Sequence, residues 1–84
     1  MDIVVYIDEK FCENGNYKFT RLPRNININD VLWFATDGAV RCGYKINEID
    51  ESNPIVYWNT NSFVKPNPFD IETKPFKGFK YRWW

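Results

Sequence analysis

The sequence predicts a single all-β domain, a small antiparallel barrel or strongly bent sheet of five to six strands with no long helix. Strong helix formers are scarce, with two Ala, two Leu, one Met and no Gln in 84 residues, whereas β-branched and aromatic residues favour strands. Short apolar runs are separated by Asn-Gly, Asp-Gly and Pro turn signals. Sixteen aromatic residues, each able to bury roughly 150–250 Å², supply a core for one domain over residues 1–84.

The first two expected strands cover residues 2–12 and 17–22. They flank Asn14-Gly15, a pair that accepts the positive φ angles of a type I′ turn. We therefore expect them to pair as an antiparallel hairpin. Pro23 ends the second strand, because proline cannot donate a hydrogen bond to a neighbouring strand.

A third strand over 31–35 and a fourth over 40–47 flank a second hairpin signal, Thr36-Asp37-Gly38-Ala39. The fourth strand has the clearest alternation in the chain, with apolar residues expected on one face at Val40, Cys42, Tyr44 and Ile46. A polar turn closed by Pro54 then leads into a fifth strand over 55–60.

The C-terminal third contains Pro66, Pro68 and Pro75. Between residues 61 and 75 these prolines favour an ordered loop pinned by Phe63 and Phe69, or a short extended segment, over a helix. The alternation of aromatic and basic residues in 79–83 predicts a closing strand with one face in solvent.

One part of the sequence resembles a known architecture. The stretch Ile28-Asn29-Asp30-Val31-Leu32-Trp33-Phe34, a Gly-containing turn and then Gly43-Tyr44-Lys45-Ile46 are similar to the opening hairpin of SH3-like barrels. The resemblance implies a polar turn before one strand and a mid-strand glycine at which the next strand bends. It covers about twenty residues, concerns the fold, and assigns no functional residue.

The residue inventory argues against catalysis. The chain has no His and only two Cys, so it cannot assemble the usual zinc or iron–sulfur ligand sets, nor a Ser-His-Asp or Cys-His pair. The acidic clusters at 8–13 and 48–51 lack the spacing of a calcium loop and are expected to be solvated turn charges. We expect no enzyme, no cofactor and no metal site, and two reduced cysteines, Cys12 and Cys42.

Charge is distributed unevenly although eleven basic and eleven acidic residues balance overall. Segment 74–84 holds four cations, five aromatics and no anion, which makes it the candidate binding surface, as a closing strand or as a tail. Trp58 is added because Trp is rarely buried completely. The candidate partner-binding residues are Phe76, Lys77, Phe79, Lys80, Tyr81, Arg82, Trp83, Trp84 and Trp58.

Two interpretations of segment 74–84 stay open. In the first, it forms an edge strand whose Phe79, Tyr81 and Trp83 enter the core while Lys80 and Arg82 keep the edge in solvent. Alternatively, its side chains contact a partner. Trp83 and Trp84 cannot lie on the same face of a strand, so one of the two rings is expected to be exposed or covered by a partner.

The leading functional hypothesis is a small non-enzymatic module that binds another protein stoichiometrically. The abundance of Asn, Ile and Lys matches an AT-rich genome, which fits many bacteria as well as a phage or mobile element. The hypothesis takes the second source, a phage or mobile-element protein that modulates a host protein. The alternative is binding of single-stranded nucleic acid by segment 74–84, with cations on phosphates and rings on bases. A homodimer through the C-terminal strand is also open.

The N-terminus lacks a signal-peptide pattern, so we expect a cytoplasmic protein without membrane association.

Overall fold

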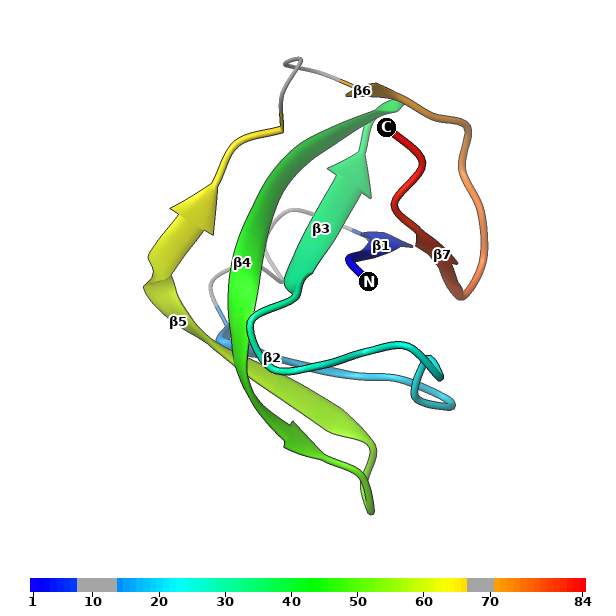
Figure 1. The fold of residues 1–84 in the computed structure, drawn as a ribbon. Helices are drawn as coiled ribbons and strands as arrows, with labels where there is room; N and C mark the ends of the chain where they lie inside the picture. Colours follow the sequence, from blue (N-terminus) through cyan, green and yellow to red (C-terminus); the bar gives the residue numbers. More distant parts are fainter. Residues whose placement is uncertain (8–13, 67–70) are drawn as a thin grey trace.

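The computed structural model describes residues 1–7, 14–66 and 71–84 and is all-β in these ranges (Figure 1). In the described residues no helix has the length and apolar character needed to cross a membrane. The strands are β1 Ile3–Tyr6, β2 Asn16–Lys18, β3 Val31–Thr36, β4 Ala39–Asp50, β5 Ile55–Val64, β6 Ile71–Glu72 and β7 Phe79–Tyr81.

The strands form one curled sheet that resembles half of a barrel. Six of them lie in the order β2-β5-β4-β3-β1-β7, and β6 pairs with β4 beyond the end of β5. All pairs are antiparallel except β1 with β3, which run parallel with Ile3 opposite Leu32. The prediction of a small, strongly bent all-β sheet is therefore confirmed.

The predicted first hairpin is wrong. β1 pairs with β3 and β7, and β2 pairs with β5 instead. Ile3, Val4 and Val5 are completely buried, so β1 needs cover on both faces, which only an interior strand receives. Gly15 has the expected positive φ of 76°, but the two strands that the turn was expected to join do not pair with each other. Residues 8–12 of the predicted strand lie outside the described residues.

The predicted second hairpin is confirmed. Asp37 and Gly38 have φ angles of 51° and 84°, as a type I′ turn requires, and Thr36 lies opposite Ala39. The single-face prediction for the fourth strand fails at Val40. The register shifts between Phe34 and Ala35, which leaves Arg41 as an extra residue in a β-bulge and turns Val40 to the opposite face.

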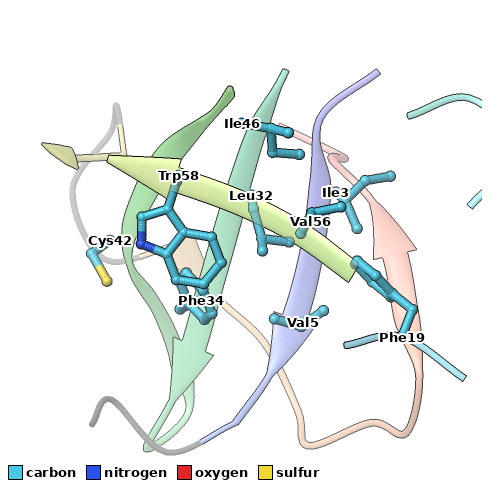
Figure 2. Packing of buried hydrophobic residues seen from close by; sticks show 9 residues of the cluster. All are labelled: Ile3, Val5, Phe19, Leu32, Phe34, Cys42, Ile46, Val56 and Trp58. Carbon is cyan, nitrogen blue, oxygen red and sulfur yellow. The ribbon is translucent and has the colours of Figure 1, made fainter. Parts of the chain in front are cut away.

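The sheet consequently has two apolar faces. On the inner, concave face, Val56 and Trp58 of β5 lie across Leu32 and Phe34 of β3 (Figure 2). This inner core contains Ile3, Val5, Phe19, Leu32, Phe34, Cys42, Ile46, Val56 and Trp58. The outer face buries a smaller cluster of Val4, Trp33, Ala35 and Val40, against which Phe76 and Trp84 of the C-terminal segment pack. Alternation along β1 and β3 supplies both faces at once.

β5 is longer than predicted and continues through part of the expected loop. Its pairing with β4 steps from Ile46 opposite Trp58 to Tyr44 opposite Phe63, so residues 59–62 include extra residues on the β5 side. The Ser62 hydroxyl donates to Asn59 O at 2.6 Å and accepts from the Lys45 amide at 3.2 Å, which holds this bulge in place. Phe63 contacts Tyr44 as an edge-to-face pair, whereas Phe69 lies outside the described residues.

Gly43 lets β4 pass under an indole ring. A Cβ at this position would lie 2.6 Å from both Trp33 Cε3 and Val31 Cγ1, which is closer than carbon atoms can approach. Trp33 is only 3% exposed, so its ring occupies the space that the missing side chain leaves. The mid-strand glycine noted in the sequence thus sets the position of the main aromatic ring on the outer face.

We expect Gly43→Ala to lower the free energy of unfolding by about 1–3 kcal/mol, the usual cost of overpacking a full site. Urea denaturation followed by Trp fluorescence measures this change. Lys45→Ala, on an exposed position of the same strand, is the matched control and should change stability by less than about 0.5 kcal/mol. Equal stability of the two variants would contradict the close packing of Trp33 on Gly43.

Candidate functional site

The C-terminal segment is anchored to the edge of the sheet by β7, which pairs with β1. Phe79 and Tyr81 lie opposite Val5 and Ile3 of β1, and the Arg82 amide extends the ladder by donating to Asp2 O at 3.0 Å. The segment then turns back along the outer face, where its end lies near β3 and β4 in Figure 1. Pairing with β1 therefore determines which of its side chains reach the surface.

Alternation within β7 separates the predicted site residues into two groups. Phe79 and Tyr81 pack against the inner core, as the edge-strand interpretation expected. The same interpretation is wrong for Trp83, which is 45% exposed because β7 ends at Tyr81. Lys80 points the other way, and together with residues before and after β7 it forms a surface that we call the outer patch. The outer patch consists of Phe76, Lys80, Arg82, Trp83 and Trp84.

Rings and cations alternate across the outer patch. The Lys80 ammonium lies 4.7 Å from the centre of the Phe76 ring and 5.9 Å from that of Trp83. Trp83 meets Trp84 edge to face at 5.1 Å, and the Arg82 guanidinium lies 5.1 Å from the Trp84 ring. Each cation contact of this kind is worth roughly 0.5–1 kcal/mol at an exposed site, so the contacts restrict these side chains before any partner arrives.

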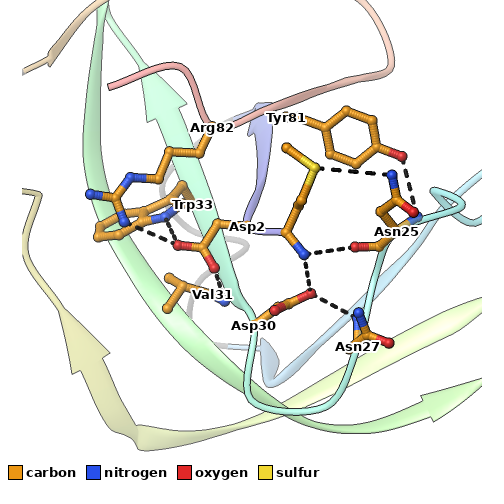
Figure 3. Close-up of polar contacts among 9 residues, drawn as sticks. Asp2, Asn25, Asn27, Asp30, Val31, Trp33, Tyr81 and Arg82 are labelled. Carbon is orange, nitrogen blue, oxygen red and sulfur yellow. Dashed lines mark hydrogen bonds and ion pairs between the residues drawn. The ribbon is translucent and has the colours of Figure 1, made fainter.

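Asp2 connects the outer patch to the sheet (Figure 3). Its carboxylate accepts hydrogen bonds from the Val31 amide at 2.9 Å and from Trp33 Nε1 at 3.2 Å. It also forms an ion pair with Arg82 Nη1 at 3.2 Å. A single carboxylate thus holds the first residues of β3, the central indole of the outer face and the C-terminal segment together.

The two terminal indoles differ in environment, as the sequence predicted. Trp83 is 45% exposed. Trp84 packs edge to face on Trp33 with ring centres 5.4 Å apart, and its Nε1 is buried without a hydrogen-bond partner among the described atoms. Trp84 is therefore an anchor in the outer face, and Trp83 is the ring that a partner could reach.

The remaining candidates lie elsewhere. Lys77 is exposed. Trp58 is 4% exposed and lies in the inner core between Phe34 and Tyr44, so it presents no ring face at the surface. Sequence reasoning added it on the general exposure of Trp, but Trp58 lies, like Val56, on the face of β5 that is turned toward the inner core.

Sequence reasoning missed a second surface feature, which we call the seam groove. This hollow of about 260 Å³ lies between β2 and β7 and is lined by Tyr17, Lys18, Phe19, Thr20, Arg21, Gly78 and Phe79. Burial raises the pKa of the Tyr17 phenol. The available signal was residues 14–28, which contain three cations and no anion, but the wrong partner assigned to β2 concealed it.

The described residues contain no group of three or more His, Cys, Asp or Glu side chains placed to hold a metal ion. The thiol of Cys42 is not part of a disulfide and is buried in the inner core. Cys12 lies outside the described residues, so its expected state is not addressed by the structure.

We expect Asp2→Ala to lower the free energy of unfolding by about 1–3 kcal/mol, because it leaves the Val31 amide and the Trp33 indole without an acceptor. Guanidinium denaturation measures the loss. Glu51→Ala removes the same charge from an exposed turn and should be nearly neutral. If both variants lose equal stability, net charge rather than the Asp2 hydrogen bonds is responsible.

Comparisons with protein-family models, with curated proteins and with solved structures found no match to this chain. The outer patch and the seam groove are therefore interpreted from their own geometry and chemistry.

Proposed function

We propose that this chain is a non-enzymatic binding module that acts by stoichiometric association with another protein through the outer patch. The supporting observation is Trp83, a large ring that is 45% exposed and contacts Trp84 and Lys80. Trp, Tyr and Arg residues dominate the energetics of protein interfaces. A ring already restricted by its neighbours loses less conformational entropy on binding than a free one.

The contacts around Trp83 support a defined anchor better than a flexible tail. Trp84 packs on the buried Trp33, and Arg82 is tied to Asp2. The two residues next to Trp83, Arg82 and Trp84, are therefore both held in place by contacts with the sheet. Under this proposal the partner contributes a pocket for one indole with acceptor groups near Lys80.

The biological setting of the proposal follows the composition. The high content of Asn, Ile and Lys in a chain of 84 residues suggests a phage or mobile-element protein that acts in the bacterial cytoplasm on a host protein. Occupying a host surface requires no catalytic group, which agrees with a residue inventory that lacks His.

Trp83→Ala should abolish capture of the partner and leave the fold intact. Loss of a hot-spot Trp costs about 2 kcal/mol or more, which corresponds to roughly 30-fold in affinity. The measurement is affinity capture from bacterial lysate, with stoichiometry read from the eluted complex. Phe63→Ala is the matched control, since Phe63 is 47% exposed and lies on a different strand.

Two results would contradict the proposal. One is equal capture by the wild type and by Trp83→Ala. The other is failure of the wild type to retain any protein in a stoichiometric amount, in which case protein binding through the outer patch would be abandoned.

Single-stranded nucleic acid binding is the second candidate, favoured by the four cations and absence of anions in segment 74–84. Against it, Arg82 is paired with Asp2, and Trp84 is packed on the sheet, which leaves Trp83 as the ring of this segment best placed to stack on a base.

If nucleic acid is the ligand, an oligonucleotide should quench Trp fluorescence less at about 200 mM salt than at about 50 mM, because phosphate contacts release counterions. The triple variant Lys77→Ala, Lys80→Ala and Arg82→Ala should bind more weakly and with a flatter salt dependence. Circular dichroism checks that the variant is folded. Unchanged binding by this variant would exclude the C-terminal segment as the nucleic acid site.

A further inference from the structure

We propose that the seam groove binds an extended acidic peptide, which adds as a strand to the free edge of β7. This inference rests on the proposed protein-binding function but concerns a different surface, since the outer patch and the seam groove involve opposite faces of β7. It assigns a chemical class, a short acidic segment of a partner protein, to a site with unused hydrogen-bonding groups.

The first argument is the free backbone of β7. The Arg82 amide bonds to Asp2 O, and Val4 lies opposite Lys80, so by the alternation of an antiparallel ladder the Lys80 backbone groups face β1. The backbone groups of Phe79 and Tyr81 then face away from β1. β7 is the last strand in the order, so these groups form an open edge.

β2 presents a second open edge across the groove. The Gly15 carbonyl accepts from the Trp58 amide, and the Phe19 amide donates to Pro54 O, both at 3.0 Å, so the backbone groups of Asn16 and Lys18 face away from β5. In the described part of the chain no ladder joins β2 to β7. The curled sheet therefore stops short of closing at this seam.

Side chains, not backbone hydrogen bonds, bridge the seam. The rings of Phe19 and Phe79 meet edge to face at 6.1 Å, and Tyr17 contacts Phe19 at 4.8 Å. Figure 2 shows the side chain of Phe19, the residue after β2, close to β7. Tyr17 and Phe79, which are partly exposed, give the groove an apolar base on which alternate side chains of an added strand could rest.

Gly78 leaves the approach to β7 open. A Cβ on this residue would meet no heavy atom within 4 Å. The groove is lined by this glycine and Phe79 on one side and by residues 17–21 on the other. Access to backbone amides and carbonyls is the requirement for adding a strand.

Charge selects an acidic occupant. Residues 14–28 contain Lys18, Arg21 and Arg24 without an acidic residue, and residues 73–84 contain four more cations and likewise no acidic residue. Among the described residues, Arg82 forms an ion pair with Asp2. Lys18 and Arg21 form no ion pair with any described residue. A peptide that alternates acidic and apolar residues would meet the cations with one face and the phenyl rings with the other.

A peptide fits these features better than a nucleic acid strand. Phe19 is only 5% exposed and meets Phe79 through an edge-to-face contact, so it offers no free ring face for a base. The open amides and carbonyls match the backbone of an extended peptide in both polarity and spacing.

The test uses the full chain and a fluorescein-labelled peptide of about six residues that alternates Glu and Val, followed by fluorescence anisotropy. Lys18→Glu should weaken binding about tenfold. Lys45→Glu, the same change on an exposed position of β4, should have no effect. Two further peptides carry N-methyl groups on every second amide nitrogen, one on the odd-numbered and one on the even-numbered residues. One of the two should not bind and the other should bind normally, because only one set of amides faces β7.

Several outcomes would overturn the inference. The first is that the peptide does not bind at about 1 mM. The second is that Lys18→Glu and Lys45→Glu weaken the affinity for the peptide equally. The third is that neither pattern of N-methylation changes the affinity. Competition by an oligo-dT strand would assign the groove to nucleic acid. Sedimentation showing a dimer that Lys18→Glu dissociates would assign it to a second copy of the chain. Trp83→Ala should bind the peptide normally, so failure at the outer patch and failure at the seam groove are distinguishable.

Discussion

The position of β1 between β3 and β7 is the constraint on which the rest of the structure depends. Its residues Ile3, Val4 and Val5 are completely buried and contribute to both apolar faces. Asp2, directly before the strand, bonds to β3 and to Arg82. One four-residue strand therefore joins the start of the described chain to its end, and the C-terminal segment has its orientation because β1 provides its hydrogen bonds.

The outer face illustrates how an apolar surface can be covered without a second sheet. Val4, Trp33, Ala35 and Val40 would be exposed on a sheet of this size, and Phe76 and Trp84 cover them. The cations of the same segment lie over its rings. Basic and aromatic residues interleaved in a sequence can thus serve the fold and a binding surface together, with Trp83 at the boundary between the two.

Local signals predicted the fold class and one hairpin, but pairings between distant strands could not be deduced from them. Asp37-Gly38 specified its turn through two positive φ angles, and period-two patterns located most strands. The parallel pairing of β1 with β3 leaves no local signature, because it depends on which buried strand has two faces to cover. The β-bulge at Arg41 similarly reverses the face of Val40 without a signal in the residue pattern.

The same reasoning explains the outcome for the candidate site. Composition identified segment 74–84, and the steric rule for adjacent residues predicted that Trp83 and Trp84 would differ. The burial of Trp58 follows from the path of β5 across the concave face, which no short stretch of sequence encodes. The seam groove depends on which strands end up at the two edges, and only the complete strand order reveals it.

The pairing of β1 has a consequence for the order in which the molecule assembles. Ile3 meets Leu32 of β3, and at the other edge it meets Tyr81 of β7, so β1 cannot complete its pairing until β7, which follows all the other strands in the sequence, has been synthesised. The β3–β4–β5 meander closes through short loops and needs no such wait. We expect its amides to be protected first in pulse-labelled hydrogen exchange, with β1 and β7 joining in a single later step. Simultaneous protection of all strands would show instead that the sheet condenses as one unit.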